Sequence, residues 1–324
     1  MSAAMGRSLG TSSTPDESAR LASLMHRLPR RVILMVGDST LRNQFIQLAR
    51  IGLSFPRHTP VAYTVVHGNH TGRFVTPYPI ENADKPDSSN GFWGGFPWLI
   101  ASTTSNLTLV YAKVWGCPSL RPVLNRMEIV LRKQRHRPGT RAHKNWPPDL
   151  VTWNFGLHLL HVFPARPVPT SSVQCALGYK DLVRDSLREI REVLPRSQRI
   201  WRTTNAVCDH QFSGAWAAAA GVHHCTDDSC ATARTQRMRR LCQRRYNVTQ
   251  RQCELTFMDR QNTAEQRAAS LAVLLPAHLE VGVLDAFDIT DGQCTATADG
   301  RHYPRLLAKI NHAWLTKILE ILAV

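Results

Sequence analysis

Three short segments, far apart along this sequence, hold side chains that could together catalyse acyl transfer. Ser39 follows one apolar run, Asn154 follows a second, and Asp299 precedes His302 by three residues near the carboxyl end. A serine hydroxyl becomes a nucleophile when an imidazole accepts its proton, and a carboxylate beside that imidazole fixes its tautomer. The four residues therefore supply a nucleophile, a base, an orienting acid and an amide donor.

Ser39 ends the tripeptide Gly37-Asp38-Ser39, which interrupts the apolar run 32–36. Apolar residues then recur at helical spacing, namely Leu41, Phe45, Leu48 and Ile51. This pattern predicts a buried strand, a tight turn and a helix, with Ser39 at the carboxyl end of the strand. The Ser39 N–H at the helix start could stabilise an oxyanion, although a serine in this place is more commonly an N-cap.

The spacing of Asp299 and His302 can place the carboxylate beside one imidazole nitrogen, so that the other nitrogen faces the nucleophile. In the alternative, Asp299 caps a helix that starts near Pro304, and His302 is a surface residue. Asn154 can supply a second oxyanion donor from its strand end. In the alternative, Asn154 and Gly156 form an ordinary turn that leaves the strand.

Apolar runs and helical patterns alternate along the chain. The predicted strands are 32–36, 61–66, 107–114, 150–153, 199–203 and 281–284, and the predicted helices include 181–194, 264–275 and 306–322. Alternation of this kind is typical of an α/β fold. We expect a three-layer α/β/α domain with a central parallel sheet of the flavodoxin-like kind.

This domain is expected to span residues 29–324, after a flexible leader over residues 1–28. Residues 118–148 are basic and rich in proline, and residues 205–262 are rich in cysteine and arginine. Both segments are interpreted as insertions into the one domain.

The order of these segments resembles that of the SGNH (GDSL-type) hydrolases, and more closely that of their PC-esterase branch. This branch includes the trichome-birefringence-like polysaccharide O-acetyltransferases and the sialate O-acetyltransferase. The resemblance spans about residues 31–320 through short islands, which are 37–42, 154–158, 200–204, 283–287 and 299–303.

The resemblance implies that Ser39 is the nucleophile, His302 the base and Asp299 its orienting acid. It also implies an oxyanion hole that contains the Ser39 N–H, Asn154 and a glycine after the second strand. Gly68 fits the place of that glycine, but Gly94 and Gly95 compete with it.

Three further residues are candidates for contact with the substrate, each with a structural alternative. Asp38 and Arg42 belong to the same motif as Ser39 and could instead form an ion pair that braces the turn. His158 could contact the substrate or fill a structural position.

The chain has a formal net charge of +16, and 15 of its 40 Lys and Arg residues lie in two clusters, over residues 121–144 and 234–251. Such stripes can hold acidic polymers, yet the sequence contains no recognised nucleic-acid module. We expect a carbohydrate or glycan substrate, which the charge suggests is acidic.

No cofactor is expected, except an acyl donor such as an acetyl-carrying cosubstrate if the enzyme is a transferase. The alternatives are a catalytically idle basic module that binds acidic polysaccharide and a cytosolic hydrolase of small esters.

Cysteines and glycosylation sequons favour the secretory lumen or secretion. There are eight cysteines, five of them between residues 208 and 253, and sequons begin at Asn69, Asn106 and Asn247. Residues 1–30 lack an apolar signal segment, so a cytoplasmic location is the alternative, and no run is long enough for a transmembrane span. Residues 223–230, with Cys208 and His210, could alternatively form a zinc site. Their spacing is looser than that of usual zinc ligands, so no metal is expected.

Overall fold

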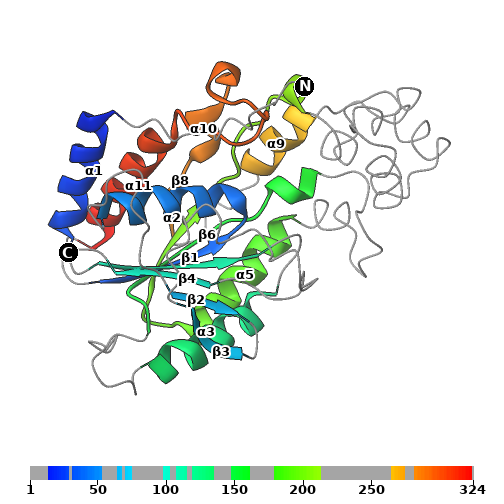
Figure 1. Cartoon of the computed structure of the whole chain (residues 1–324). Coiled ribbons are helices and arrows are strands. Elements are labelled where there is room, and N and C mark those ends of the chain that lie inside the picture. The colour runs from blue at the N-terminus through cyan, green and yellow to red at the C-terminus, as the bar shows by residue number, and fades with distance from the viewer. Residues whose placement is uncertain are drawn as a thin grey trace, which may run out of the picture.

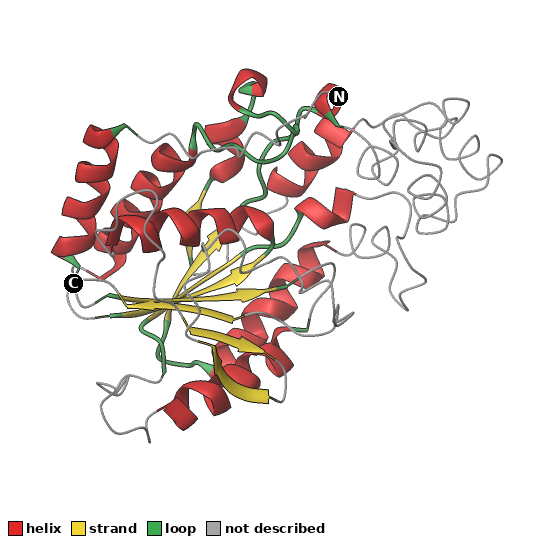
Figure 2. Ribbon diagram, viewed as in Figure 1, coloured by secondary structure: helices red, strands yellow, loops and turns green. Residues whose placement is uncertain are grey.

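The computed structural model contains an eight-stranded sheet with helices on both faces (Figures 1 and 2). It describes residues 14–28, 31–52, 64–67, 70–74, 98–102, 107–114, 119–134, 147–160, 179–212, 264–273 and 281–322. The strands are β1 (Val32–Gly37), β2 (Thr64–His67), β3 (His70–Phe74), β4 (Trp98–Ser102), β5 (Thr108–Lys113), β6 (Leu150–Trp153), β7 (Gln198–Arg202) and β8 (Gly282–Leu284). Their order across the sheet is β3-β2-β4-β5-β1-β6-β7-β8.

Five neighbouring strands, β5, β1, β6, β7 and β8, are parallel to one another. Numbered along the chain among themselves, they lie in the order 2-1-3-4-5, which is the flavodoxin-like order. The predicted α/β fold with a central parallel sheet is therefore confirmed. The strand order reverses between β1 and β6, and ligands of open α/β sheets bind outside the carboxyl ends of the strands at such a point.

The remaining strands add an antiparallel part to one edge of the central parallel sheet. Strand β4 pairs antiparallel with β5, β2 pairs antiparallel with β4, and β3 pairs antiparallel with β2. Antiparallel neighbours need only short connections, so this part of the chain can add to one edge of the sheet without crossover helices. The strand predicted over residues 61–66 is present as β2, which begins at Thr64 within the described residues.

Helices cover both faces of the sheet. They are α1 (Pro15–Arg27), α2 (Ser39–Gly52), α3 (Leu120–Gln134), α5 (Tyr179–Val193), α9 (Ala264–Val273), α10 (Ala286–Thr290) and α11 (Leu307–Leu322), with short 3-10 helices η2 (Leu157–Leu160), η3 (Asp209–Gln211) and η4 (Cys294–Ala296). Among the described helices, none is long and apolar enough to cross a membrane.

Side chains of β1 alternate between the two faces of the sheet, as the pleat of a strand requires. Leu34 and Val36 pack in a core with α3 and α5, while Ile33 and Met35 pack in a second core with α1, α2 and α11. Figure 1 shows these two groups of helices on opposite faces of the sheet. The molecule thus has the expected three layers, and β1 is buried on both faces.

The expected flexible leader over residues 1–28 is wrong for its second half, which forms α1. Thr14 caps this helix, since its hydroxyl accepts from the Glu17 N–H at 3.2 Å and its N–H donates to the Glu17 carboxylate at 2.8 Å. Leu21 and Met25 are buried in the core with α11. A reciprocal cap and an apolar face are sufficient to anchor a helix. Residues 1–13 lie outside the described residues.

The segment expected to be an insertion at 118–148 contains a core helix. Leu120, Leu124 and Met127 of α3 are fully buried, and the carboxylate of Glu189 on α5 accepts from the first N–H groups of α3. This contact satisfies donors that a helix start leaves open. Residues 135–146 lie outside the described residues. Within the segment 205–262, the structure describes residues 205–212, which are largely buried beside the sheet. The rest of the segment lies outside the described residues.

Candidate active site

A tight turn between β1 and α2 presents Ser39 at the carboxyl edge of the sheet. Gly37 ends β1 and Ser39 begins α2, so only Asp38 lies between the two elements. A Cβ on Gly37 would come within 2.9 Å of the backbone carbonyl of Asn154 and within 2.9 Å of Leu41. Only glycine therefore lets β1 and the segment after β6 approach this closely.

Hydrogen bonds fix the shape of this turn from two sides. The Asp38 carboxylate accepts from the N–H of Thr40 at 2.8 Å and from its hydroxyl at 2.6 Å. On the other side, the hydroxyl of Tyr111 on β5 contacts the carbonyl oxygens of Gly37 at 2.9 Å and of Asp38 at 3.1 Å. Because Asp38 is 1% exposed, its carboxylate braces the turn through Thr40, while its ion pair with Arg42 and its contact with the substrate stay predictions.

The structure brings Ser39, His302 and Asp299 into one line of hydrogen bonds. The Ser39 Oγ lies 2.7 Å from Nε2 of His302, and Nδ1 of His302 lies 2.7 Å from Oδ2 of Asp299. A carboxylate only accepts, so Nδ1 carries the proton and Nε2 is left to accept from the serine hydroxyl. This is the tautomer that a general base needs.

Further donors surround the carboxylate of Asp299. Its Oδ1 accepts from the N–H of His302 at 2.9 Å, the N–H of Arg301 at 3.1 Å and the hydroxyl of Thr297 at 3.3 Å, and its Oδ2 accepts from Nε of Arg301 at 3.1 Å. Burial raises the pKa of Asp299, but the hydrogen bonds and charge of His302, with the charge of Arg301, outweigh it and hold the pKa below its ordinary value. Asp299 is therefore ionised at neutral pH.

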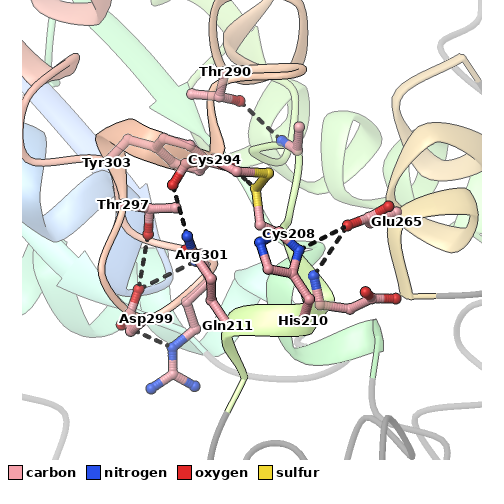
Figure 3. Close-up of a disulfide and its surroundings, with 12 residues drawn as sticks. Cys208, His210, Gln211, Glu265, Thr290, Cys294, Thr297, Asp299, Arg301 and Tyr303 are labelled. Atoms are coloured by element: carbon pink, nitrogen blue, oxygen red, sulfur yellow. Dashed lines mark hydrogen bonds and ion pairs between the residues drawn. A yellow bond between two sulfur atoms is a disulfide. The ribbon is translucent and has the colours of Figure 1, made fainter.

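A disulfide between Cys208 and Cys294 anchors the loop that carries Asp299 and His302 (Figure 3). The two cysteines are 86 residues apart at the carboxyl edge of the sheet, where Cys208 directly precedes η3 and Cys294 begins η4. The N–H of Cys208 donates to the carbonyl of Gly300 at 2.8 Å, and the side chain of Gln211 donates to the carbonyl of Cys294 at 2.8 Å. The segment after β7 thus holds the acid–base loop in place.

Asn154 lies beneath the nucleophile turn and is fully buried. Its amide satisfies its neighbours when the nitrogen donates to Oδ1 of Asp38 at 3.1 Å and the oxygen accepts from Nη1 of Arg202 at 3.3 Å. This side chain therefore braces the turn, and its expected role as an oxyanion donor stays a prediction.

A second predicted oxyanion group is the Ser39 N–H. Ser39 is the first residue of α2, and the first N–H groups of a helix have no partner within the helix. They also lie at the positive end of the helix dipole, which favours a developing negative charge. Gly68, Gly94 and Gly95 lie outside the described residues.

Two predicted substrate contacts are only partly described. Arg42 is half-buried in the first turns of α2. Burial lowers the pKa of its guanidinium, and the nearby Tyr111 and Asp38 oppose this shift. His158 lies in η2, and its side chain is outside the described structure. The roles of both residues in substrate binding stay predictions.

Sequence reasoning missed Arg202, which ends β7 and is 1% exposed beside the turn. Burial lowers its pKa to about 10, while the charge of Asp38 raises it. The sequence places this arginine in a predicted strand, but only the fold shows that the end of that strand lies under the nucleophile.

Within the part of the chain that the structure describes, one group of possible metal ligands lies near the disulfide, and it does not fit a metal. His210, Glu265 and Cys294 have donor atoms within 4.8 Å of one another. A metal needs the thiolate of a cysteine, however, and the sulfur of Cys294 is bonded to Cys208. In Figure 3, His210 and Glu265 lie on one side of this disulfide. Residues 223–230, which hold the other possible zinc ligands, lie outside the described residues.

Comparison with known proteins does not identify this site. No family model matches the sequence, and no curated protein matches it. One similar solved structure is of a protein from Parabacteroides merdae named as a GDSL-like lipase, with 12% identity, coverage of 89% of this chain and 97% of the other, and a TM-score of 0.37. Another is of a SAR1-type GTP-binding protein from Encephalitozoon cuniculi, with 9% identity, coverage of 95% and 89%, and a TM-score of 0.34. Neither likeness is close enough to assign a family or an activity to the chain.

Proposed function

We propose that this protein is a serine-dependent esterase or O-acyltransferase that acts on O-acylated carbohydrate through an acyl-enzyme on Ser39. One observation carries the proposal, namely the continuous line of hydrogen bonds from Ser39 through His302 to Asp299. An ordinary helix cap would not require an imidazole at 2.7 Å from the serine oxygen, nor a carboxylate on the far side of that imidazole.

In the first half of the reaction, the Ser39 Oγ attacks the carbonyl carbon of the ester as Nε2 of His302 takes its proton. The carbonyl oxygen becomes an oxyanion, for which the Ser39 N–H at the start of α2 is a donor. Asp299 stabilises the imidazolium that forms. When the intermediate collapses, the carbon–oxygen bond to the leaving alcohol breaks, and that alcohol takes the proton from His302.

In the second half, the acyl group leaves Ser39 for an acceptor. Water or a sugar hydroxyl gives its proton to Nε2 of His302 and attacks the acyl carbonyl. The bond to the Ser39 Oγ then breaks, and the serine recovers the proton. The two halves use the same groups in reverse. Water as acceptor makes the enzyme an esterase, and a hydroxyl makes it a transferase fed by an acetyl-carrying cosubstrate.

The motif order supports placing the chain with the SGNH hydrolases and their PC-esterase branch. The turn at Ser39 follows the first strand of a flavodoxin-like sheet, Asn154 follows the adjacent strand β6, and Asp299 and His302 come from the loop before α11. This placement rests on residue types in that order on this fold. It is also the basis for a carbohydrate substrate, and the net charge of +16 favours an acidic one.

We further propose that the protein works in the secretory lumen or outside the cell. The disulfide between Cys208 and Cys294 supports this location, because structural disulfides persist in oxidising compartments. Counting reactive thiols in the denatured, natively produced protein tests it. Few or no thiols among the eight cysteines are expected, whereas eight reactive thiols would place the protein in the cytoplasm.

The proposed function is tested by replacing Ser39 with Ala and comparing Ser270→Ala as the control. Ser270 is an exposed residue of α9 whose hydroxyl contacts only the helix backbone at Gln266 among its described partners. Each purified protein is assayed for hydrolysis of a chromogenic acetyl ester and for acetyl transfer to oligosaccharides. We expect activity in the wild type and in Ser270→Ala, and its loss in Ser39→Ala.

The same assay separates the proposal from a catalytically idle binding protein. Equal activity in Ser39→Ala and the wild type would remove Ser39 from the chemistry. Binding of an acidic polysaccharide by a wild type that neither hydrolyses nor transfers acyl groups would favour a binding module instead.

A further inference from the structure

Arg202 lies at the centre of a polar network that is shut away from solvent. Arg202 is 1% exposed, and Gln44 and Thr40, its partners on α2, are 0% and 3% exposed. A buried arginine is costly to desolvate and must satisfy its donors within the protein. Burial of this guanidinium therefore costs more free energy than burial of an apolar side chain of similar volume at the same position.

On one side, the guanidinium holds the helix of the nucleophile. Nε of Arg202 donates to the side-chain oxygen of Gln44, and Nη1 donates to the hydroxyl of Thr40 at 3.2 Å. The same hydroxyl donates to the carboxylate of Asp38 at 2.6 Å. Thr40 and Asp38 flank Ser39 in the chain, so Arg202 supports both neighbours of the nucleophile.

On the other side, the guanidinium reaches the loop of the base through one intermediate residue. Nη2 of Arg202 donates to the side-chain oxygen of Asn205 at 2.6 Å, and the side-chain nitrogen of Asn205 donates to the carbonyl of Arg301 at 3.1 Å. Arg301 directly precedes His302 in the chain. Asn205 is itself 3% exposed, so water does not replace either of these bonds easily.

The result is a short chain of hydrogen bonds that joins the residue after the nucleophile to the residue before the base. It runs from Thr40 through Arg202 and Asn205 to Arg301. The two ends belong to segments about 260 residues apart, as are Ser39 and His302 themselves. A planar guanidinium fixes the angles between its partners better than a flexible ammonium does.

We propose that Arg202, acting through Asn205, is a positioning residue that sets the approach of His302 to Ser39. The proposal rests on the proposed function, since it assigns the network to that reaction. Neither residue contacts the reacting atoms, so both act through the segments that they hold. Rate effects of small displacements in such sites are large, because the base must lie within hydrogen-bond reach of the proton that it accepts.

The sharpest test is Asn205→Asp. The carboxylate still accepts from Nη2 of Arg202, but it has no proton to donate to the carbonyl of Arg301. The bond to the loop of the base is therefore lost while the buried arginine keeps its partner. Asn125→Asp, an exposed position on α3, controls for the added negative charge.

A second pair of variants tests the arginine itself. Arg202→Lys keeps a positive charge but loses the planar guanidinium, and Arg202→Met loses both the charge and the guanidinium. Arg199→Met is the control on the same strand, since the Arg199 side chain contacts the carbonyl oxygens of Leu194 and Pro195 away from Ser39. Thermal unfolding of each variant identifies any that does not fold, and a variant that does not fold leaves Asn205→Asp as the deciding one.

The experiment measures the rate at which a fluorophosphonate labels Ser39, together with kcat and KM for a soluble acetyl ester and the pH dependence of both. We expect Asn205→Asp to lower the labelling rate and kcat at least tenfold with KM little changed, while Asn125→Asp and Arg199→Met match the wild type. Arg202→Lys should retain more activity than Arg202→Met. A wild type that is labelled at Ser39, with Asn205→Asp labelled equally fast, would overturn the role of the network alone. A wild type that is not labelled would overturn the proposed function together with it.

Discussion

The backbone N–H of Cys208 donates to the carbonyl of Gly300 at 2.8 Å, beside the disulfide that joins Cys208 to Cys294. The contact is close because Gly300 has no side chain. A Cβ there would lie 2.3 Å from the carbonyl oxygen of Cys208, and φ of Gly300 is +74°. The loop that carries Asp299 and His302 is therefore shaped by a glycine and held by a covalent cross-link.

Replacing Gly300 with Ala should lower both stability and activity. A left-handed backbone alone costs a residue with a side chain about 1–2 kcal/mol, and the clash with the carbonyl of Cys208 adds to this cost by displacing the loop. We expect the free energy of unfolding to fall by more than about 2 kcal/mol and kcat for ester hydrolysis to fall at least tenfold. Denaturant unfolding and steady-state kinetics measure the two effects.

Gly292→Ala is the control for this substitution. Gly292 has a similar φ of +67°, but a Cβ there would meet nothing within 4 Å. The variant should show the backbone cost with little change in kcat. Equal losses of activity in the two variants would contradict the idea that the contact with Cys208 positions the catalytic loop.

Removing the disulfide should destabilise the loop as well as the fold. The double variant Cys208→Ser with Cys294→Ser leaves no unpaired thiol from this pair, and it should cost roughly 2–5 kcal/mol of unfolding free energy because the cross-link closes a long loop of the unfolded chain. We also expect a lower kcat. A variant with lower stability but unchanged kcat under conditions in which it is fully folded would limit the disulfide to a structural role.

Two buried tyrosines offer a paired test of the nucleophile turn. The hydroxyl of Tyr111 contacts the carbonyl oxygens of Gly37 and Asp38, whereas that of Tyr179 donates to the carbonyl of Phe155. Replacing either tyrosine with Phe should cost about 1–2 kcal/mol of stability, because a buried acceptor loses its donor. Only Tyr111→Phe should also lower kcat. Similar kcat values for both variants would mean that Tyr111 does not shape the turn.

Replacing Asp299 with Asn should reduce kcat by about 10⁴-fold, because the amide does not hold the imidazole in the required tautomer. The change should also alter the dependence of stability on pH. The pKa of Asp299 is lower in the folded protein than its ordinary value, so its carboxylate stabilises the fold above that ordinary value, and this stabilisation is lost as the pH falls through the folded pKa. The stability difference between the wild type and the variant should therefore shrink below about pH 4.

Unfolding measured across that pH range tests this prediction. Asp288→Asn, at an exposed position on α10, is the control and should leave kcat unchanged. A stability difference that stays constant down to the lowest pH would contradict the lowered pKa of Asp299.

The parallel core of the fold could be predicted from the sequence because its signals are local. The run Val32–Gly37 is buried on both faces and therefore lacks alternation, and the tripeptide that follows breaks the strand at Ser39. The start of α1 also has a local signal, namely the capping box of Thr14 and Glu17 with Pro15 at the first helical position. The polar composition of residues 1–28 points instead to a leader, and it outweighs this signal when composition alone is considered.

The antiparallel strands and the buried network could not be predicted in the same way. The partner of Trp98–Ser102 is the next strand, β5, but a segment of five residues gives too weak a pattern to predict the strand and its pairing. Likewise, nothing local to Arg202 shows that it meets Thr40, 162 residues earlier. The pairing of Cys208 with Cys294 is one of many that eight cysteines allow. The types of the catalytic residues are visible in the sequence, whereas the groups that support them are visible only in the fold.

The proposed acyl-enzyme on Ser39 is tested most directly by the mass of the protein during turnover. The wild type is mixed with an activated acetyl ester, quenched in acid and measured as an intact protein, and the modified peptide is then identified. We predict a mass increase of one acetyl group on the peptide that contains Ser39, and none in Ser39→Ala. Turnover by the wild type without an acyl group on Ser39 would contradict the proposed mechanism. The mechanism would also be contradicted if Ser39→Ala were acylated and turned over the ester as the wild type does.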